Sequence, residues 1–353
     1  MAGLACLSAA AFSAAQTPPA SDTTAIQAFP VRSVSTVDIA LVLPLETPAF
    51  ARAAEAVRAG FLAAAEAARD KLRTKVIAHG EDGVLGAFAA ARDAGARVVV
   101  GPLARDDVKN VAELSLELPF TIALNQLDDA ATAPLQLYTF ALSIDSDARQ
   151  IARRMHVDAA RNVAIIGADT SLMQRFASAF AAAWLAEGGS APGVYEYAAT
   201  PAALSNMRRE IAKNRPDAAL VALDGDGATR AKPYLGTKPA YASGLVFERE
   251  RQGDARDLDG LIVVEIPWIV TPNAPQFASL PKREFASAAL TRLYALGLDA
   301  YRVAEAFRDG PPERFSLDGA TGQVALVDGR QFAREGRFAV YRAGQLTPLD
   351  GPR

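Results

Sequence analysis

Short apolar runs alternate with longer amphipathic stretches along most of this 353-residue chain. The run Val37–Leu45 (VDIALVLPL) is continuously apolar, and Pro48–Arg69 after it places Ala, Val, Phe and Leu at helical spacing. The alternation continues with predicted strands at Lys75–His79, Arg97–Val100 and Thr121–Leu124 and predicted helices at Gly83–Ala94 and Arg105–Leu116. Apolar strands separated by helices predict a parallel sheet that is covered on both faces.

A second series of the same kind begins near Leu137–Ile144, where Asp145 and Ser146 are expected to cap a helix at Asp147–Ala159. Strands are then predicted at Asn162–Ile166, Val194–Tyr197, Ala218–Leu223 and Ala240–Ser243, and helices at Leu172–Glu187 and Pro201–Asn214. The apolar run Leu261–Val270 precedes a long predicted helix, Arg283–Phe307. The tail Phe315–Leu349 is predicted to form short hairpins, because Asp318-Gly319, Asp328-Gly329 and Ala343-Gly344 interrupt it.

These two series indicate an α/β protein with two doubly wound, Rossmann-like lobes joined by a hinge. We assign residues 37–143 and 271–353 to lobe 1 and residues 144–270 to lobe 2, because we expect the chain to return to the first half near its end. The length supports two lobes, since 353 residues exceed what one hydrophobic core usually supports. In such folds the loops at the carboxyl ends of the strands line a cleft.

The first fifteen residues, Met1–Ala15, form a short apolar run that ends in small residues, which is typical of a signal peptide. Residues 16–36 are rich in Pro, Ser and Thr and are predicted to be a flexible linker. We therefore expect export to the periplasm. The single cysteine, Cys6, lies in the leader, and the residues before it match a lipid-attachment site poorly. Export without a lipid is favoured over anchoring as an outer-membrane lipoprotein.

Charge and motif content exclude several classes of function. The net charge of −3, with Lys and Arg scattered along the chain, predicts no nucleic-acid partner. The two histidines, His79 and His156, have no Cys or His at ligand spacing, so a structural role is favoured over catalysis for both. No nucleophile elbow, phosphate-binding loop or dinucleotide-binding glycine motif follows a predicted strand.

Two acidic patterns resemble a calcium loop and a pair of catalytic carboxylates. Asp224-Gly225-Asp226-Gly227 resembles the start of a Ca²⁺ loop, but Leu235 stands where that loop requires a glutamate. A cleft-facing turn with positive-φ glycines is the favoured interpretation. Asp145 and Asp147 could be paired carboxylates, but helix capping is favoured for them. We expect no catalytic constellation, no metal site, no cofactor and no enzymatic activity.

Several segments carry a resemblance to a known family. They are IALVLPL (39–45), FARAAEAVRAGF (50–61), VGPL (100–103), ALN (123–125), DLDG (257–260), IPW (266–268), RLYALGLDAYRV (292–303) and LDGATG (317–322). In this order they resemble the C-terminal, periplasmic-binding-protein-like domain of the penicillin-binding protein activators, the LppC or LpoA lipoproteins. VGPL and IALVLPL also fit amino-acid-binding proteins of the same fold. The combination of IPW with RLYALGLDAYRV is more specific.

The resemblance implies a periplasmic binding protein fold of type I and a non-catalytic regulator of peptidoglycan synthesis. Its implied partner is a class A penicillin-binding protein, which is a peptidoglycan synthase. Longer members of the family carry a helical-repeat domain before this one, whereas here we expect only the linker of residues 16–36. The alternative is a solute-binding protein that delivers an amino-acid-like ligand to an ABC transporter.

The cleft candidates stand at predicted strand ends. They are Leu45, Glu46, Gly101, Pro102, Asn125 and Gln126 in the first half and Asp169, Thr170, Asp224 and Ser243 in the second. Relatives that bind carboxylates usually place Ser or Thr just after the Gly-Pro turn. Here Leu103-Ala104-Arg105-Asp106 offers no hydroxyl, which weakens amino-acid recognition and leaves Arg105 as a candidate anion ligand.

Aromatic and arginine residues near the end of the chain have two interpretations. Trp268 could stack on a ligand, but packing in the hinge core is favoured. The helix Arg283–Phe307 carries four candidates for a partner-binding face, because Tyr and Arg are frequent anchors of interfaces. They are Arg292, Tyr294, Tyr301 and Arg302. The favoured alternative is that the two tyrosines, seven residues apart, pack in one buried stripe while the two arginines are solvated.

Overall fold

The computed structural model describes residues 37–81, 83–114, 117–127, 133–247 and 255–349. The predicted signal peptide with Cys6 and the predicted linker lie outside these residues. Among the helices of the described part, none is both long and apolar enough to cross a membrane.

The first sheet has the strand order β11-β12-β13-β5-β4-β3-β1-β2. Its parallel part consists of β1 (Ile39–Leu43), β2 (Thr74–Ala78), β3 (Val98–Val100), β4 (Phe120–Ala123) and β5 (Leu137–Thr139). The antiparallel strands β11 (Phe315–Asp318), β12 (Gln323–Asp328) and β13 (Gln331–Glu335) follow, and β13 pairs with β5. β1 lies where the winding reverses, because β2 pairs with one of its edges and β3 with the other.

Helices cover both faces of the first sheet, which explains why β1 is apolar throughout. Ile39 and Leu41 pack in the core that contains residues of α1 (Ala51–Ala67) and α9 (Ala288–Ala306). Ala40 and Val42 point to the other face, into the core that contains residues of α2 (Val84–Asp93) and α3 (Arg105–Ala112). The period of two along the strand thus supplies two separate cores.

The second sheet repeats this winding in the order β15-β14-β10-β9-β8-β6-β7. Its parallel part consists of β6 (Val163–Gly167), β7 (Gly193–Glu196), β8 (Ala218–Ala222), β9 (Ala240–Ser243) and β10 (Leu261–Glu265). The helices α4 (Ile144–Val157) and α5 (Ser171–Ala186) contribute to the core on one face. The helices α6 (Pro201–Asn214) and α7 (Gly225–Ala231) contribute to the core on the other. The two doubly wound sheets confirm the predicted α/β class.

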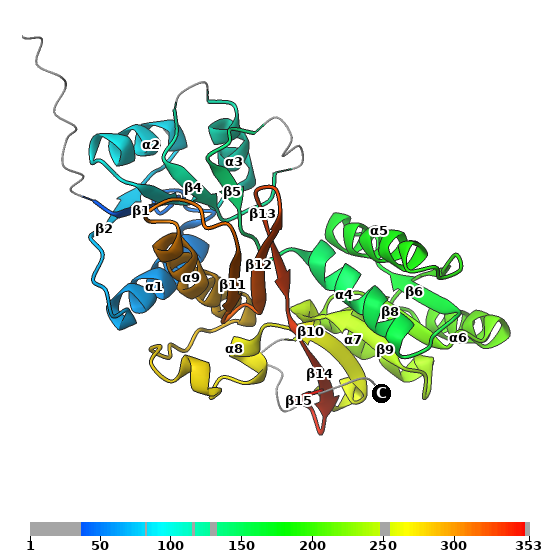
Figure 1. Ribbon diagram of the computed structural model, residues 1–353. Coiled ribbons are helices and arrows are strands. Elements are labelled where there is room, and N and C mark those ends of the chain that lie inside the picture. The colour runs from blue at the N-terminus through cyan, green and yellow to red at the C-terminus, as the bar shows by residue number, and fades with distance from the viewer. Residues whose placement is uncertain (1–36, 82, 115–116, 128–132, 248–254, 350–353) are drawn as a thin grey trace, which may run out of the picture. The chain divides into compact units, whose positions relative to one another are not determined.

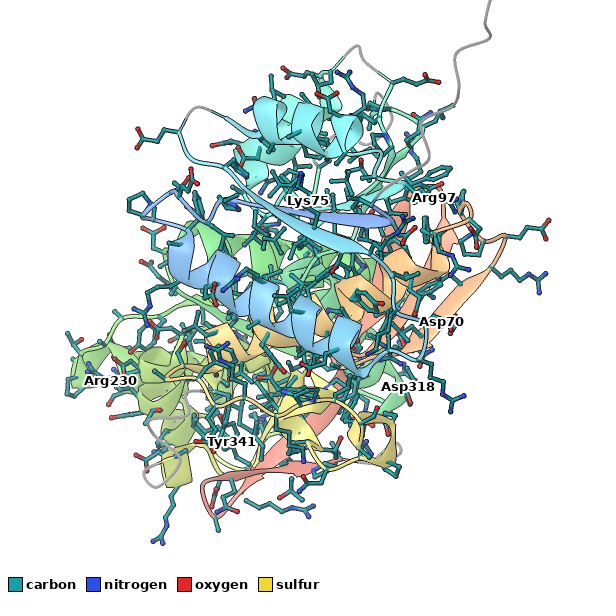
Figure 2. The ribbon with its side chains drawn as sticks, turned by 90° about the vertical axis from the view of Figure 1, so that its left-hand side faces the viewer. Asp70, Lys75, Arg97, Arg230, Asp318 and Tyr341 are labelled. Atoms are coloured by element: carbon teal, nitrogen blue, oxygen red, sulfur yellow. The ribbon has the colours of Figure 1, made fainter. Side chains whose placement is uncertain are left out.

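The last two strands correct the assignment of residues 271–353 to lobe 1. β14 (Arg337–Arg342) pairs antiparallel with β10, and β15 (Gln345–Pro348) pairs with β14, so both belong to the second sheet (Figure 1). Tyr341 packs in the core that includes residues of α7, and Figure 2 shows it on the same side of the molecule as Arg230 of that helix. The hairpins themselves were predicted, but their pattern does not say which sheet they extend.

The chain passes between the two sheets three times: after β5, after β10 and between β13 and β14 (Figure 1). The second passage contains the short helix α8 (Pro267–Val270) and leads into α9. α9 lies unusually close to α1, because a Cβ on Gly297 would lie 2.1 Å from the carbonyl oxygen of Val57 and one on Gly60 would lie 1.9 Å from that of Tyr294. This close crossing fixes the position of α9, which carries residues to the candidate site.

Two local predictions, the cap of one helix and a turn with positive-φ glycines, differ from the structure. Ser143, and not Asp145 or Ser146, caps α4, since its side chain accepts a hydrogen bond from the backbone N–H of Ser146. Asp224 caps α7 by accepting from the N–H of Gly227 at 2.7 Å. The Asp224–Gly227 segment is therefore a helix start, and neither of its glycines has a positive φ. A short oxygen side chain before a helix caps it wherever the chain enters from an extended conformation.

Candidate functional site

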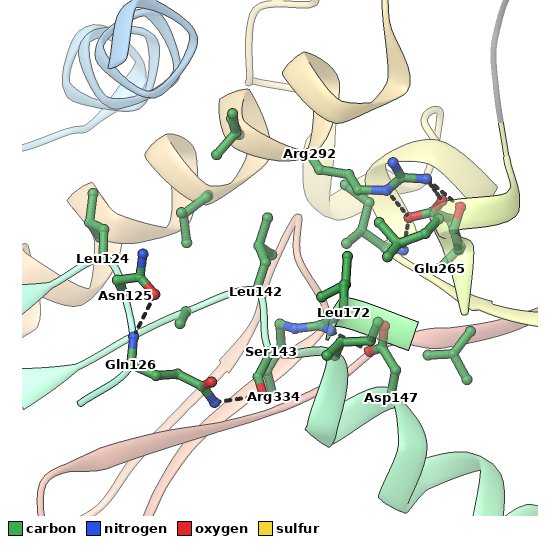
Figure 3. Close-up of a pocket in the computed structure, with 18 of the residues that line it drawn as sticks. Leu124, Asn125, Gln126, Leu142, Ser143, Asp147, Leu172, Glu265, Arg292 and Arg334 are labelled. Carbon is green, nitrogen blue, oxygen red and sulfur yellow. Dashed lines mark hydrogen bonds and ion pairs between the residues drawn. The ribbon is translucent and has the colours of Figure 1, made fainter. Parts of the chain in front are cut away.

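A cavity of about 340 Å³ lies at the carboxyl ends of the parallel strands (Figure 3). The segment after β4 supplies Leu124, Asn125 and Gln126, and the first passage between the sheets supplies residues 141–144. The end of β9, the end of β10 and one face of α9 supply most of the opposite wall. The residues from these three elements are Gly244, Leu245, Val264, Glu265, Ile266, Arg292, Leu293 and Leu296. This is the edge at which doubly wound sheets bind their ligands.

A buried ion pair joins α9 to the end of β10. Nη2 of Arg292 lies 2.5 Å from Oε2 of Glu265, and Nε lies 3.0 Å from Oε1 (Figure 3). The same Nη2 donates to the carbonyl oxygen of Gly244, and Oε1 of Glu265 also accepts from the N–H of Ile266. Burial alone would lower the pKa of Arg292, but the carboxylate of Glu265 outweighs it, so the pKa lies above its ordinary value. Only 1% of the Glu265 side chain is exposed.

A second buried pair joins β13 to α4. Nη2 of Arg334 donates to Oδ1 of Asp147, and Nη1 donates to the carbonyl oxygen of Thr321 at 3.0 Å. Burial raises the pKa of Asp147, and the guanidinium of Arg334 opposes that shift. Helix α4 also contacts the passage between β13 and β14, since Nε2 of Gln150 donates to the carbonyl oxygen of Gly336 at 2.7 Å.

The loop that presents Thr321 is fixed by Asp299, a fully buried residue of α9. The carboxylate of Asp299 accepts hydrogen bonds from the N–H groups of Ala320 and Thr321 and from the Thr321 hydroxyl at 2.9, 2.7 and 2.6 Å. Burial raises its pKa, although these donors favour the charged form. A Cβ on Gly319 would lie 2.4 Å from this carboxylate, so the loop requires glycine there. Asp299 thus positions the loop that contacts Arg334.

A third contact joins α5 to the segment after β4. Arg175 donates to the carboxylate of Asp145 and to Oε1 of Gln126. Nε2 of Gln126 in turn donates to the hydroxyl of Ser143 at 2.7 Å, in the first passage between the sheets. Asn125 is also engaged, because its side chain donates to the carbonyl oxygen of Leu103 and accepts from the N–H of Gln126. The polar groups at this wall are therefore paired within the chain.

The rest of the cavity wall is aliphatic. It is formed by Leu103, Leu124, Ala141, Leu142, Ile144, Leu172, Leu245, Val264, Ile266, Leu293 and Leu296. These side chains come from elements of both sheets. The site is thus a largely apolar cavity whose wall also contains charged side chains that form ion pairs within the chain.

The structure brings together only some of the residues predicted from strand ends. Arg105, Asn125 and Gln126 line the cavity. Thr170, Asp224 and Ser243 instead accept hydrogen bonds from backbone N–H groups at the starts of α5, α7 and a short 3₁₀ helix. Leu45, Glu46, Gly101, Pro102 and Asp169 are not among the lining residues either. Position after a strand therefore does not decide which residues reach the cavity, because many of them cap the next helix.

The predicted partner-binding face on α9 is largely internal. Tyr294 and Tyr301 are each 1% exposed, so the predicted buried stripe is confirmed. The accompanying prediction of solvated arginines is wrong for Arg292, which is 11% exposed and paired with Glu265. Tyr294 donates to the carbonyl oxygen of Pro281, and Arg302 contacts the buried Asp299. Trp268 packs in the same core against Tyr294, as favoured. Arg292 faces the cavity, and neither of the two buried tyrosines is available to a partner on the surface.

Four charged side chains that line the cavity are not identified by the sequence patterns. Asp147 was interpreted as part of a helix cap, and Arg334, Glu265 and Arg175 were not singled out. Glu265 interrupts the apolar run LIVVEIPWIV, and a charge inside a buried strand needs a partner. Arg334 stands two residues after the buried Phe332, on the same face of its strand. Both signals were present in the sequence, but their partners are distant in the chain.

No candidate metal site emerges among the described residues. Groups of three or more His, Cys, Asp or Glu side chains that could hold a metal ion are absent from this part of the chain. His79 is buried with Nε2 3.8 Å from Asp107, and His156 lies on α4 beside Trp184.

A family model described as "LppC putative lipoprotein" matches residues 10–217 and 202–344, which is most of the chain. The chain belongs to the LppC family. Among curated members, the penicillin-binding protein activator LpoA of Mannheimia succiniciproducens is 26% identical over 281 residues, covering 76% of this chain and 48% of that protein. LpoA of Klebsiella pneumoniae is 27% identical over 304 residues, covering 74% of this chain and 42% of that protein. This LppC-family chain spans about half the length of the curated relatives it matches.

Solved structures confirm the expected periplasmic binding protein fold of type I for this LppC-family chain. The C-domain of LpoA from Haemophilus influenzae, described as a regulator of PBP1A, has a TM-score of 0.75 at 22% identity, covering 88% of this chain and 99% of that chain. A structure described as a "putative branched-chain amino acid ABC transporter" from Chromobacterium violaceum has a TM-score of 0.76 at 31% identity, covering 86% of this chain and 99% of that chain.

Proposed function

We propose that this LppC-family protein is a non-catalytic regulator of peptidoglycan synthesis that binds a class A penicillin-binding protein. The observation that carries the proposal is the match to proteins named penicillin-binding protein activator LpoA over about three quarters of the chain. The LpoA C-domain described as a regulator of PBP1A has the same fold over 88% of the chain.

The chemistry of the cavity supports a regulator rather than an enzyme. General acid–base or nucleophilic catalysis needs a group that can reach the substrate in a reactive protonation state. Here Glu265 and Asp147 are each held by an arginine of the same chain. Such pairs connect elements of the two sheets, and we propose that their role is to fix the arrangement that a partner recognises.

The proposed location is the periplasm. The family is described as lipoproteins, and the apolar run at residues 1–15 is typical of an export signal. A penicillin-binding protein works on the outer side of the inner membrane, so an exported chain would share a compartment with it.

A pull-down with activity readout tests the proposal. The purified exported chain would be mixed with a class A peptidoglycan synthase of the same organism, and glycan polymerisation and peptide cross-linking would be followed with and without it. We expect a stoichiometric complex and a faster rate of at least one of the two reactions. A class B synthase is the specificity control. No complex and no rate change at micromolar concentrations of both proteins would refute the proposal.

A second candidate, a solute-binding protein, is favoured by one observation. The Chromobacterium violaceum structure is 31% identical and is covered over 99% of its length. A solute receptor should bind an amino acid saturably and gain about 2.7 kcal/mol of stability at a ligand concentration of 100 times the Kd. A melting scan with the twenty amino acids therefore separates the candidates, because the regulator needs no such shift.

A further inference from the structure

The cavity has the size of a small-molecule site. Its volume of about 340 Å³ lies within the range of roughly 300–1,000 Å³ that ligand pockets usually have. Its walls come from elements of both sheets, so a molecule in it would contact the two halves of the fold at once. What can bind there is decided by the groups that face it.

Most charges at the cavity are already engaged within the chain. Six charged side chains line it, and five of them form ion pairs: Asp147, Arg175, Glu265, Arg292 and Arg334. The sixth, Arg105, also has an interaction within the structure. A ligand carboxylate would have to displace Glu265 from Arg292 or Asp147 from Arg334, and would leave a buried carboxylate without its partner. A ligand ammonium would have to take those same carboxylates from their arginines.

The uncharged side chains around the cavity also favour an apolar ligand over a carboxylate. Amino-acid receptors need donors for a carboxylate, and the segment Leu103-Ala104 before α3 has aliphatic side chains where a hydroxyl would serve. Asn125 and Gln126, the amides at this wall, are engaged by Leu103, Arg175 and Ser143. The remaining wall consists of Leu, Val and Ile side chains, which gain free energy from contact with aliphatic groups in proportion to the buried apolar area.

We propose that this cavity binds an uncharged molecule with a branched aliphatic group, and that it excludes amino acids and carboxylates. The inference does not rest on the regulator role, because such a molecule can bind whether or not a synthase does. It also predicts a selectivity opposite to that of a receptor for charged amino acids.

Three probes of nearly equal shape test the charge selectivity. They are 4-methylpentanamide, which is neutral, 4-methylpentanoate, which is an anion at pH 7.4, and L-leucine, which is a zwitterion. Binding to the full chain is measured by calorimetry and by the shift in melting temperature. We expect saturable binding of the amide, with affinities at least tenfold weaker for the other two. Equal or tighter binding of either charged probe, or no binding of the amide, overturns the proposal.

A matched pair of variants on one helix tests the location. Leu172 lines the cavity and is 49% exposed, and Leu185 lies at the other end of α5, outside the cavity, with 52% exposure. Leu172→Trp should weaken amide binding at least fivefold by filling the cavity, whereas Leu185→Trp should leave it unchanged. Leu245→Trp, at a 36% exposed lining position, replaces the first variant if that one fails to fold. Unchanged binding in both lining variants would place the probe elsewhere and end the proposal.

Discussion

Replacing Glu265 by glutamine isolates the contribution of the buried ion pair between α9 and β10. The substitution keeps the shape of the side chain and removes only its charge. Arg292 is 11% exposed and Glu265 is 1% exposed, so bulk water replaces the lost carboxylate poorly. The variant leaves a guanidinium that is largely buried and lacks the carboxylate that contacts it.

The expected loss is large because of this burial. Removing one partner of a buried ion pair costs about 3–5 kcal/mol, whereas exposed pairs contribute about 0–1 kcal/mol. Arg58 and Glu55 on α1 form such an exposed pair, with side chains 39% and 42% exposed. We therefore expect Glu265→Gln to lower the free energy of unfolding by about 3–5 kcal/mol and Glu55→Gln to lower it by less than about 1 kcal/mol.

Urea unfolding followed by circular dichroism and by tryptophan fluorescence measures both losses. Coincident transitions from the two probes are required before the free energies are compared. The double variant Glu265→Gln with Arg292→Met removes both charges and should recover more than half of the loss, because the buried charge is then gone. If Glu265→Gln lowers the free energy of unfolding no more than Glu55→Gln does, the ion pair of Glu265 with Arg292 does not stabilise the fold as its burial predicts.

Three further outcomes follow from the structure. Gly297→Ala should lower the free energy of unfolding by about 1–3 kcal/mol, because the new methyl group meets a backbone carbonyl of α1. In the same urea assay, Gly86→Ala should raise that free energy by up to about 1 kcal/mol, because its methyl group meets nothing within 4 Å. Thr170→Ala should cost about 1 kcal/mol by removing the cap of α5 and should leave probe binding in the cavity unaltered; a loss of binding would contradict its role as a cap. The N–H groups of Asn162 and Arg161 lower the pKa of Asp217 below 3.8, so its contribution to stability is present above that pH and is lost as the pH falls through the lowered pKa. Asp217→Ala should therefore lower the melting temperature more at pH 7 than at pH 2; an equal effect at both pH values would refute the assignment.

The layered fold could be predicted because its signals are local. The predicted helix Pro201–Asn214 matches α6 residue for residue, since Thr200 caps it, Pro201 starts it and Arg215 ends it in the left-handed region. The run VDIALVLPL gave β1, since a strand covered on both faces is apolar at every position. Side-chain period and caps act over a few residues, and they are visible in any short window of sequence.

The candidate site could be predicted only in part, because it is made by long-range pairs. Arg334 and Asp147 are 187 residues apart, and Arg175 and Gln126 are 49 apart. Nothing local distinguishes Asp147 in the first turn of a helix from an ordinary capping residue. The pairing of β14 with β10 is equally long-range, so its sheet could not be assigned from the hairpin pattern alone.

The late position of β13 and β14 in the chain has a consequence for biosynthesis. β13 pairs with β5 and β14 pairs with β10, so β5 lacks this neighbour until residue 335 has been made and β10 lacks its own until residue 342. A ribosome-bound or translocating chain therefore exposes the edge of β5 for more than half of its synthesis and the edge of β10 near the end, and such edges favour aggregation. An exported protein of this topology would need a holding chaperone until its final residues emerge.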